Sequence, residues 1–182
     1  MNCLREVRIE ITGHPKGKGR GRAVTAAGAR VYTPADTKQW EQDARTEARS
    51  VMGGRDPFSG PCTLIAKAIF PVPRSWPAWK REAAQAGFIH HTSVPDADNI
   101  AKIAQDALNG VVFVDDGLVS TCQVTKGYGL RPGVYIEVRE LDQPQSFKDY
   151  KERFFHLTPP DPDLNMQLYN AKTGRQENDP ET

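Results

Sequence analysis

The 182-residue chain lacks several features that would place it in a familiar class of protein. Its three cysteines, Cys3, Cys62 and Cys122, form no C-x-x-C pair, so the sequence indicates neither a zinc site nor a disulfide framework. No run approaches the ~20 apolar residues needed to span a membrane, and the first residues lack a signal peptide's apolar stretch. We therefore expect a reduced, cytoplasmic protein with no membrane segment.

Nucleotide-binding fingerprints are also missing. The glycine-rich stretch 14–22 reads HPKGKGRGR, and its spacing matches neither a Walker A loop nor a dinucleotide-binding turn, so no nucleotide cofactor is expected. Glycines let a backbone approach phosphates, and cations supply the opposite charge. The pattern favours a loop that binds a DNA backbone, with a solvated flexible loop as the alternative. The cations of this loop are Lys16, Lys18, Arg20 and Arg22.

Little net charge is present, but its distribution is uneven. Residues 1–141 carry 19 lysines and arginines against 15 acids, whereas residues 142–182 carry 5 against 8 and include five prolines. A basic body suits a polyanionic partner. The chain is therefore expected to have one domain over 1–141 and an acidic, proline-containing C-terminal extension over 142–182, partly disordered from about Thr158.

Alternating and helical periods predict an α+β domain with a mixed sheet packed by helices. The run 118–126 and the strand 134–138 are expected to be antiparallel neighbours joined by a turn at Gly129–Gly133. The other expected elements are strands at 5–12 and 62–70, a hairpin over 23–33 turning at Ala27-Gly28, a helix from Pro34 to Met52 ended by Gly53-Gly54, and a short helix over 78–86.

A further short helix is flanked by two acidic pairs. Asn109-Gly110 is a suitable stop, and Asp98 or Asn99 could cap the start. Asp98, Lys102 and Asp106 follow at steps of four on the opposite face from the apolar residues. The apolar stripe comprises Ile100, Ile103, Ala104, Ala107 and Leu108.

The acidic pairs are Asp96 with Asp98 and Asp115 with Asp116. A chain that returns along the helix could bring the second pair beside the first. Clustered carboxylates repel one another unless their pKa values rise or a hard cation binds them. The alternative is that Asp98 only caps the helix and that Asp115-Asp116-Gly117 is only a turn.

Three short motifs, namely 95–102 (PDADNIAK), 106–110 (DALNG) and the pair Asp115-Asp116, resemble the signature of the RusA-like Holliday junction resolvases. These are small dimeric endonucleases of phages and prophages that resolve four-way DNA junctions with magnesium. The resemblance covers about residues 5–141 and departs at Val94, where members often carry a basic residue. It implies that Asp96, Asp98 and Asp116 are the essential acids, with Asp115 beside them, and that Lys102 is the catalytic lysine.

The resemblance further implies a Mg2+-dependent endodeoxyribonuclease, with Mn2+ as a substitute metal, acting in DNA recombination and repair. A two-fold homodimer would resolve Holliday junctions by paired nicks. Two alternatives stay open: a nuclease for other branched DNA, and a non-catalytic DNA-binding module of the same fold. Lys126 and Arg131 are further candidate phosphate contacts.

Aromatic and small residues raise two further possibilities. Trp76 and Trp79 could stack at a DNA branch point, although packing of their helix on the body is the favoured interpretation. Trp40 is expected to be a core or a dimer residue, and with Ala101 and Ala104 it could contribute to a dimer interface. His90 and His91 are left out of the catalytic set.

Overall fold

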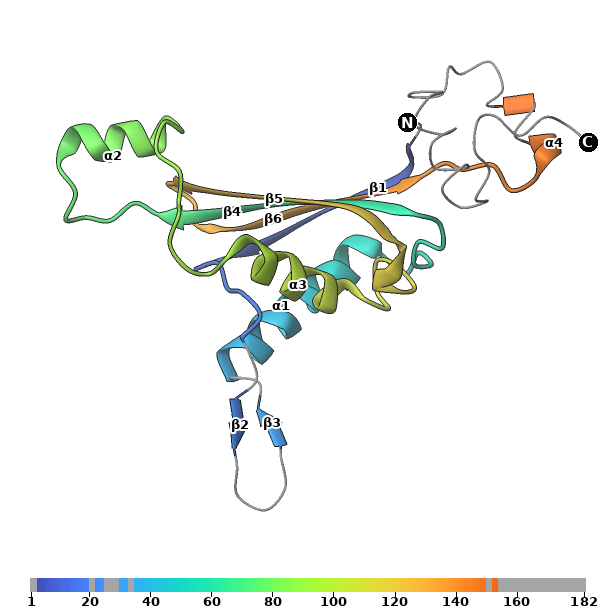
Figure 1. Cartoon of the computed structure of the whole chain (residues 1–182), viewed down its shortest axis with the longest axis horizontal. Helices are drawn as coiled ribbons and strands as arrows, with labels where there is room; N and C mark the ends of the chain where they lie inside the picture. Colours follow the sequence, from blue (N-terminus) through green and yellow to red (C-terminus); the bar gives the residue numbers. More distant parts are fainter. Residues whose placement is uncertain (1–2, 20–21, 25–29, 33–34, 150–151, 154–182) are drawn as a thin grey trace, which may run out of the picture. The chain divides into compact units, whose positions relative to one another are not determined.

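The computed structural model describes residues 3–19, 22–24, 30–32, 35–149 and 152–153 (Figure 1). Its contacts divide the chain into two units, 1–143 and 144–182. The described part of the second unit holds the short helix α4 (Phe147–Asp149). The first unit contains β1 (Cys3–Thr12), β2 (Arg22–Val24), β3 (Arg30–Tyr32), α1 (Ala35–Met52), β4 (Cys62–Pro71), α2 (Ala78–Gln85), α3 (Ala97–Leu108), the 3-10 turn η1 (Asp116–Leu118), β5 (Val119–Gly129) and β6 (Gly133–Leu141).

The main sheet has four strands in the order β1-β6-β4-β5. β6 lies antiparallel to both β1 and β4, and β5 lies parallel to β4. This mixed sheet confirms the expected α+β class. The expected pairing of β5 with β6 is wrong, because β4 lies between them although they run in opposite directions. β6 suits a central position since Val134, Ile136 and Val138 are buried, whereas β5 is largely exposed and suits an edge.

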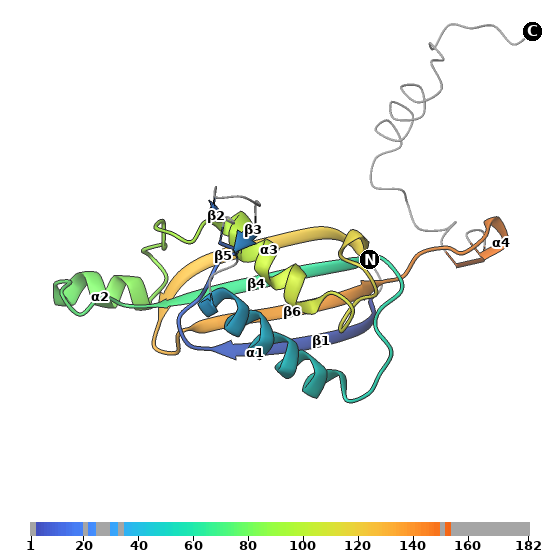
Figure 2. The same cartoon turned by 90° about the horizontal axis from the view of Figure 1, so that it is seen from below.

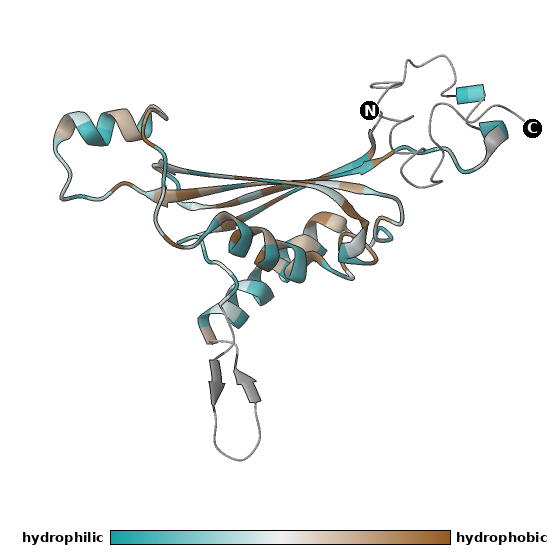
Figure 3. Cartoon of the chain, in the orientation of Figure 1, coloured by the Kyte–Doolittle hydropathy of each residue, from teal (hydrophilic) through white to brown (hydrophobic). Residues whose placement is uncertain are grey.

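Two helices cover one face of this sheet (Figures 1 and 2). α1 packs against β1, and α3 packs against β4, β5 and α1. All five apolar stripe positions of α3 are buried, as the helical period predicted. Trp40 and Ala104 lie in the same core at 7% and 0% exposure, which confirms the core alternative for Trp40 and argues against a dimer contact for either residue. Figure 3 shows hydrophobic residues on the sides of α1 and α3 that approach the sheet.

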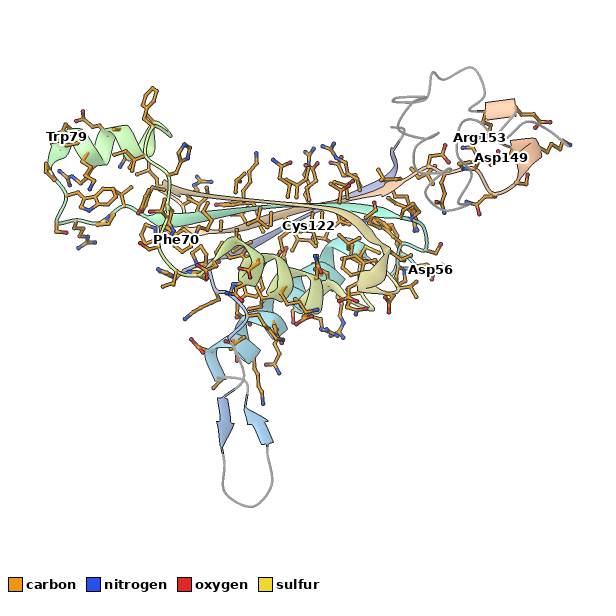
Figure 4. All side chains as sticks on the ribbon, in the orientation of Figure 1. Asp56, Phe70, Trp79, Cys122, Asp149 and Arg153 are labelled. Carbon is orange, nitrogen blue, oxygen red and sulfur yellow. The ribbon has the colours of Figure 1, made fainter. Side chains whose placement is uncertain are left out.

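The opposite face of the sheet carries polar side chains, and among the described residues of the first unit no helix covers it (Figure 4). Its charged centre is an ionic ring made by β1 and β6. Arg8 contacts Glu6 at 2.8 Å and Glu137 at 3.1 Å. Arg139 contacts Glu6 at 3.2 Å and also pairs with Glu137. Each of the four groups therefore has two oppositely charged neighbours, and the ring is neutral.

The remaining elements largely follow the sequence patterns. β2 pairs with β3, which confirms the hairpin, while its turn at 25–29 lies outside the described residues. Gly53 and Gly54 end α1 with φ values of 56° and 80°. In the described part of the chain, no helix is long and apolar enough to cross a membrane. The expected disorder beyond Thr158 also lies outside the described residues, and the division at residue 141 stays a prediction.

Candidate active site

Helix α3 begins two to three residues earlier than the sequence suggested. Asp96 occupies the N-cap position in extended conformation, and its side chain makes no capping hydrogen bond. The expected cap at Asp98 or Asn99 is therefore wrong, because both residues already lie within the first helical turn. Asp98 Oδ1 accepts a 2.8 Å bond from the N–H of Asn99. Both acids are exposed at the helix N-terminus, where the backbone dipoles favour negative charge.

The segment before Asp96 is held by β5. Lys126 Nζ donates to the carbonyl oxygens of Ser93 at 2.7 Å and Pro95 at 2.8 Å. Two of its three N–H donors thus bind backbone, and one remains for another acceptor. Lys126 fixes the approach to the acids, and its expected contact with a phosphate stays a prediction.

The chain returns from the far end of α3 through a buried loop. Phe58 donates its N–H to the carbonyl of Val112 at 2.7 Å, and its own carbonyl accepts from Val114 at 3.0 Å. Phe58 and Phe113 are fully buried, which fixes this loop against the core. Asp115 then caps η1 by accepting a 2.8 Å bond from the N–H of Gly117. The Asp115-Asp116-Gly117 sequence is therefore a turn, and it leaves the Asp116 carboxylate directed at α3.

A lysine–acid chain joins η1, α3, the basic loop and α1. Lys102 Nζ lies 3.2 Å from Asp116 Oδ2 and 2.9 Å from Asp106 Oδ1. Lys18 Nζ lies 2.8 Å from Asp106 Oδ2 and 2.7 Å from Glu41 Oε1. The order is thus Asp116, Lys102, Asp106, Lys18, Glu41. The sequence placed Asp106 one turn from Lys102 but gave it no role, and it gave no signal that Glu41 would join.

These contacts keep Lys18, Lys102 and Asp106 charged at neutral pH. Hydrogen bonds to Asp106 and then Asp116 raise the pKa of Lys102. Burial lowers the pKa of Lys18, but bonds to Asp106 and Glu41 outweigh it and the net shift is upward. Burial similarly works to raise the pKa of Asp106, but its two lysine partners bring it below its usual value.

The basic loop lies directly on the start of α3. The Lys18 N–H donates to the carbonyl of Asn99 at 2.8 Å. A Cβ on Gly17 would stand 2.6 Å from Pro95 Cβ and 3.0 Å from Asn99 Cβ, so only glycine permits this approach. Of the other predicted DNA contacts, Lys16 pairs with Asp36 at 2.8 Å and Arg131 is exposed. Arg20 and the side chain of Arg22 lie outside the described part.

The donor chemistry of the acids fits a hard divalent cation, since carboxylate oxygens are its preferred ligands. Asp96, Asp98 and Asp115 are exposed, and Asp116 is partly exposed. Within the described residues, however, no three acidic, histidine or cysteine side chains converge as a ready metal group. The cation that meets Asp116 is the ammonium of Lys102. The predicted metal ligand set therefore stays a prediction that rests on donor type and accessibility.

The site lies on an open surface rather than in a cavity. A shallow hollow lined by Arg8, Lys67 and Tyr135 is on the other face of the sheet, away from the acids. An exposed line of alternating acids and lysines along a helix suits a large charged substrate better than a small molecule.

Comparison with known proteins decides the family. The model of the family described as Endodeoxyribonuclease RusA matches residues 12–139, a span that contains both acidic pairs and the whole lysine–acid chain. This chain belongs to the RusA endodeoxyribonuclease family. Nucleases of this family generally depend on a divalent metal. An uncharacterized protein of Bacillus subtilis (strain 168), YqaN, is 31% identical over 144 residues, covering 78% of this chain and 99% of YqaN.

In this RusA-family chain, the fold brings some of the predicted site residues together. Asp116 meets Lys102 on the α3 face that starts with Asp98, although the two residues are separated by a buried loop. Asp106 was missed, and the geometry joins it to the two lysines of the site. An acid one turn from a candidate catalytic lysine was the signal that could have found it.

Proposed function

We propose that this chain is a structure-specific endonuclease that resolves Holliday junctions by paired nicks, with Mg2+ as the working metal and Mn2+ as a substitute. The observation that carries the proposal is the line on α3: two exposed acids at its N-terminus, then Lys102 bonded to the returning Asp116. A surface that only bound DNA would gain nothing from exposed acids, because they repel phosphates. Phosphodiester hydrolysis can use both signs of charge, because acids can bind a metal ion and lysines can stabilise negative charge on the phosphate.

In this proposal Asp96, Asp98 and Asp116 would hold the ion, with Asp115 beside them. A bound divalent ion supplies Lewis acidity and an activated water for attack on phosphorus. The chain's own contribution is alignment, since Lys126 fixes the backbone before Asp96 and the buried loop after α3 fixes Asp116.

Lys102 has the geometry of an electrostatic catalyst. Its ammonium has three donors, and two are taken by Asp106 and Asp116. The third can bind a phosphoryl oxygen and stabilise the charge that develops there. Because the pKa of Lys102 is raised, the group stays cationic throughout the neutral range. Lys18 has the same arrangement between Asp106 and Glu41 and would bind a flanking phosphate.

A two-fold dimer would place two such sites on equivalent strands of a four-way junction. Light scattering on the purified chain would test this, and a strictly monomeric mass with and without junction DNA would contradict the paired-nick part of the proposal. The phage or prophage context belongs to the same proposal and derives from the family resemblance.

The central prediction concerns Asp98. Asp98→Asn should abolish metal-dependent nicking of a synthetic four-way junction, because a carboxylate ligand is lost, while junction binding stays within about threefold of wild type. Gel-resolved cleavage of end-labelled four-way, Y-shaped and linear DNA, with and without Mg2+, measures both the reaction and its preference.

Asp43→Asn is the matched control, since Asp43 is an exposed α1 acid that accepts a 2.8 Å bond from Gln39. It should cut like the wild type. Nicking by Asp98→Asn at the wild-type rate would reject the site. Faster cleavage of Y-shaped DNA than of four-way junctions would assign the enzyme to other branched substrates. Junction binding without cleavage by the wild type would indicate a binding module.

A further inference from the structure

An arm formed by residues 72–91 projects from the sheet between β4 and α3, and α2 is its helix (Figure 1). The arm is poorly packed for an element with several aromatic residues. Ala84 is the buried residue of α2, whereas Trp79 is 67% exposed and Phe88 is 81% exposed. Figure 4 shows Trp79 on α2, beyond the end of the sheet. The favoured expectation that this helix packs on the body therefore fails for Trp79.

The base of the arm is nevertheless firmly attached by an aromatic cluster of Phe70, Trp76, His91 and Tyr128. Trp76 meets Tyr128 edge-on, with ring centroids 5.1 Å apart, and Tyr128 lies 5.2 Å from His91. His91 stacks on Phe70 with centroids 3.6 Å apart. Burial, followed by Lys126 and His14, lowers the pKa of His91, so its ring stays neutral and suited to this apolar stack. Both ends of the arm are thus joined at one place.

That place is also where the proposed active site begins. His91 precedes Asp96 by five residues, and the intervening carbonyls are held by Lys126. Lys126 lies two residues from Tyr128 on β5, so one strand supports both the arm and the segment that leads to the acids. The exposed aromatics are therefore carried by an element whose position relative to Asp96 is fixed by packing.

The charge of the arm indicates what it contacts. The arm contains three cations, Arg74, Lys80 and Arg81, and one acid, Glu82, so its net charge is positive. Arg74 and Arg81 line the same hollow, while Lys80 Nζ lies 4.0 Å over the Trp76 ring. Exposed rings among cations match a polyanion that also presents flat apolar faces, which is the chemistry of nucleic acid with unstacked bases. A continuous duplex hides those faces, whereas a branch point exposes them.

We propose that the arm is a branch-recognition element, in which Trp79 and Phe88 stack on bases exposed where DNA strands diverge while Arg74 and Arg81 contact the flanking phosphates. The inference rests on the proposed function and adds to it: Lys102 and Lys18 would contact the phosphates of any DNA backbone, and the arm would distinguish branched from continuous DNA.

The test uses the full chain without divalent metal, so that binding is separated from cleavage. The probes are a four-way junction carrying 2-aminopurine at its branch point and a linear duplex of matched sequence. Trp79→Ala/Phe88→Ala should weaken junction binding by about tenfold or more, as expected for loss of base stacking, and leave duplex binding unchanged. It should also abolish the change in 2-aminopurine fluorescence. Trp79→Phe with Phe88 intact should bind like the wild type.

Leu4→Ala is the control, because Leu4 is 57% exposed on β1, outside the arm. Circular dichroism checks the fold, and the fluorescence change with wild-type protein gives a readout that needs no variant. A wild type that cuts junctions but shows no 2-aminopurine change, or an alanine variant that loses equal affinity for both DNAs, overturns the arm's role and leaves the nuclease proposal intact. A wild type that neither binds nor cuts junctions overturns both.

Discussion

The ionic ring and the lysine–acid chain lie on opposite faces of the same sheet, and they use charge differently. The ring has two acids and two arginines, and every group contacts two partners. The lysine–acid chain has three acids for two lysines and stops at Asp116 without closing. A closed neutral ring balances its own charge, while an open chain that ends on a partly exposed acid retains donors and acceptors for another molecule.

The side chains reinforce this difference. Arginine in the ring offers fixed, planar donors that suit permanent pairing, whereas lysine in the chain offers three rotatable donors on a flexible stem. These differences favour a structural role for the ring and support the proposal that the lysine–acid chain contacts the substrate. A single substitution in the ionic ring and one in the lysine–acid chain should therefore have different effects on stability and on cleavage.

The largest effect is expected at the centre of the lysine–acid chain. Asp106→Asn keeps the side-chain shape but removes the charge that Lys18 and Lys102 share. Single-turnover junction cleavage should fall about 10- to 100-fold, comparable with the loss of one charge-assisted hydrogen bond. Junction binding should change much less, because both lysines remain. Cleavage equal to that of Asp43→Asn would show that Asp106 does not position them.

A second readout follows from the lowered pKa of Asp106. A carboxyl whose folded pKa lies below its unfolded value stabilises the fold above the unfolded value, near 4, and loses that contribution as pH falls through the folded value. The stability difference between wild type and Asp106→Asn should therefore be full at pH 6 and shrink as pH falls below the unfolded value and through the lowered folded value. Denaturant unfolding across this range measures it, and a pH-independent difference would contradict the assignment.

An intermediate effect is expected where the basic loop lies on α3. Gly17→Ala would place a Cβ 2.6 Å from that of Pro95, so the loop must shift and the bond from Lys18 to Asn99 must lengthen. We expect a loss of about 1–3 kcal/mol in stability, typical of overpacking, with a several-fold fall in junction cleavage. Thermal unfolding and cleavage rates measure the two. If the variant loses stability but cuts junctions at the wild-type rate, the basic loop does not contribute to the active site.

The smallest effect is expected in the ring. Arg8→Gln removes two contacts on an exposed face, so unfolding free energy should fall by at most about 1 kcal/mol and cleavage should not change. A double-mutant cycle with Glu137→Gln measures the pair directly. A larger loss, or a change in the mass of the assembly, would mean that a partner covers the ring in solution.

The sequence predicted local structure well because each signal was local. The apolar stripe of α3, the glycines after α1 and the alternation of β4 all depend on spacing within a few residues. The insertion of β6 between β1 and β4 was missed, since Val7 pairs with Val138 across most of the chain and no period reports such a pairing. Strand order is a property of the assembled core.

The same distinction applies to the site. Asp98, Lys102 and Asp106 share a face through helical spacing, which the sequence shows directly. The contact of Lys18 with Glu41 joins a loop to a distant helix, and the approach of Gly17 to Pro95 depends on packing. The motif identified the acids and Lys102, but not what holds them in position.

The aromatic cluster at the base of the arm has a consequence for how such a protein can vary. Phe70 and His91 close the arm at its base, and Trp76 anchors its first part on Tyr128, so residues 77–90 could be exchanged while these four rings stay in place. On the proposed role of the arm, exchanging this stretch should change which DNA structure the protein prefers and leave the proposed metal-dependent reaction at the acids unchanged.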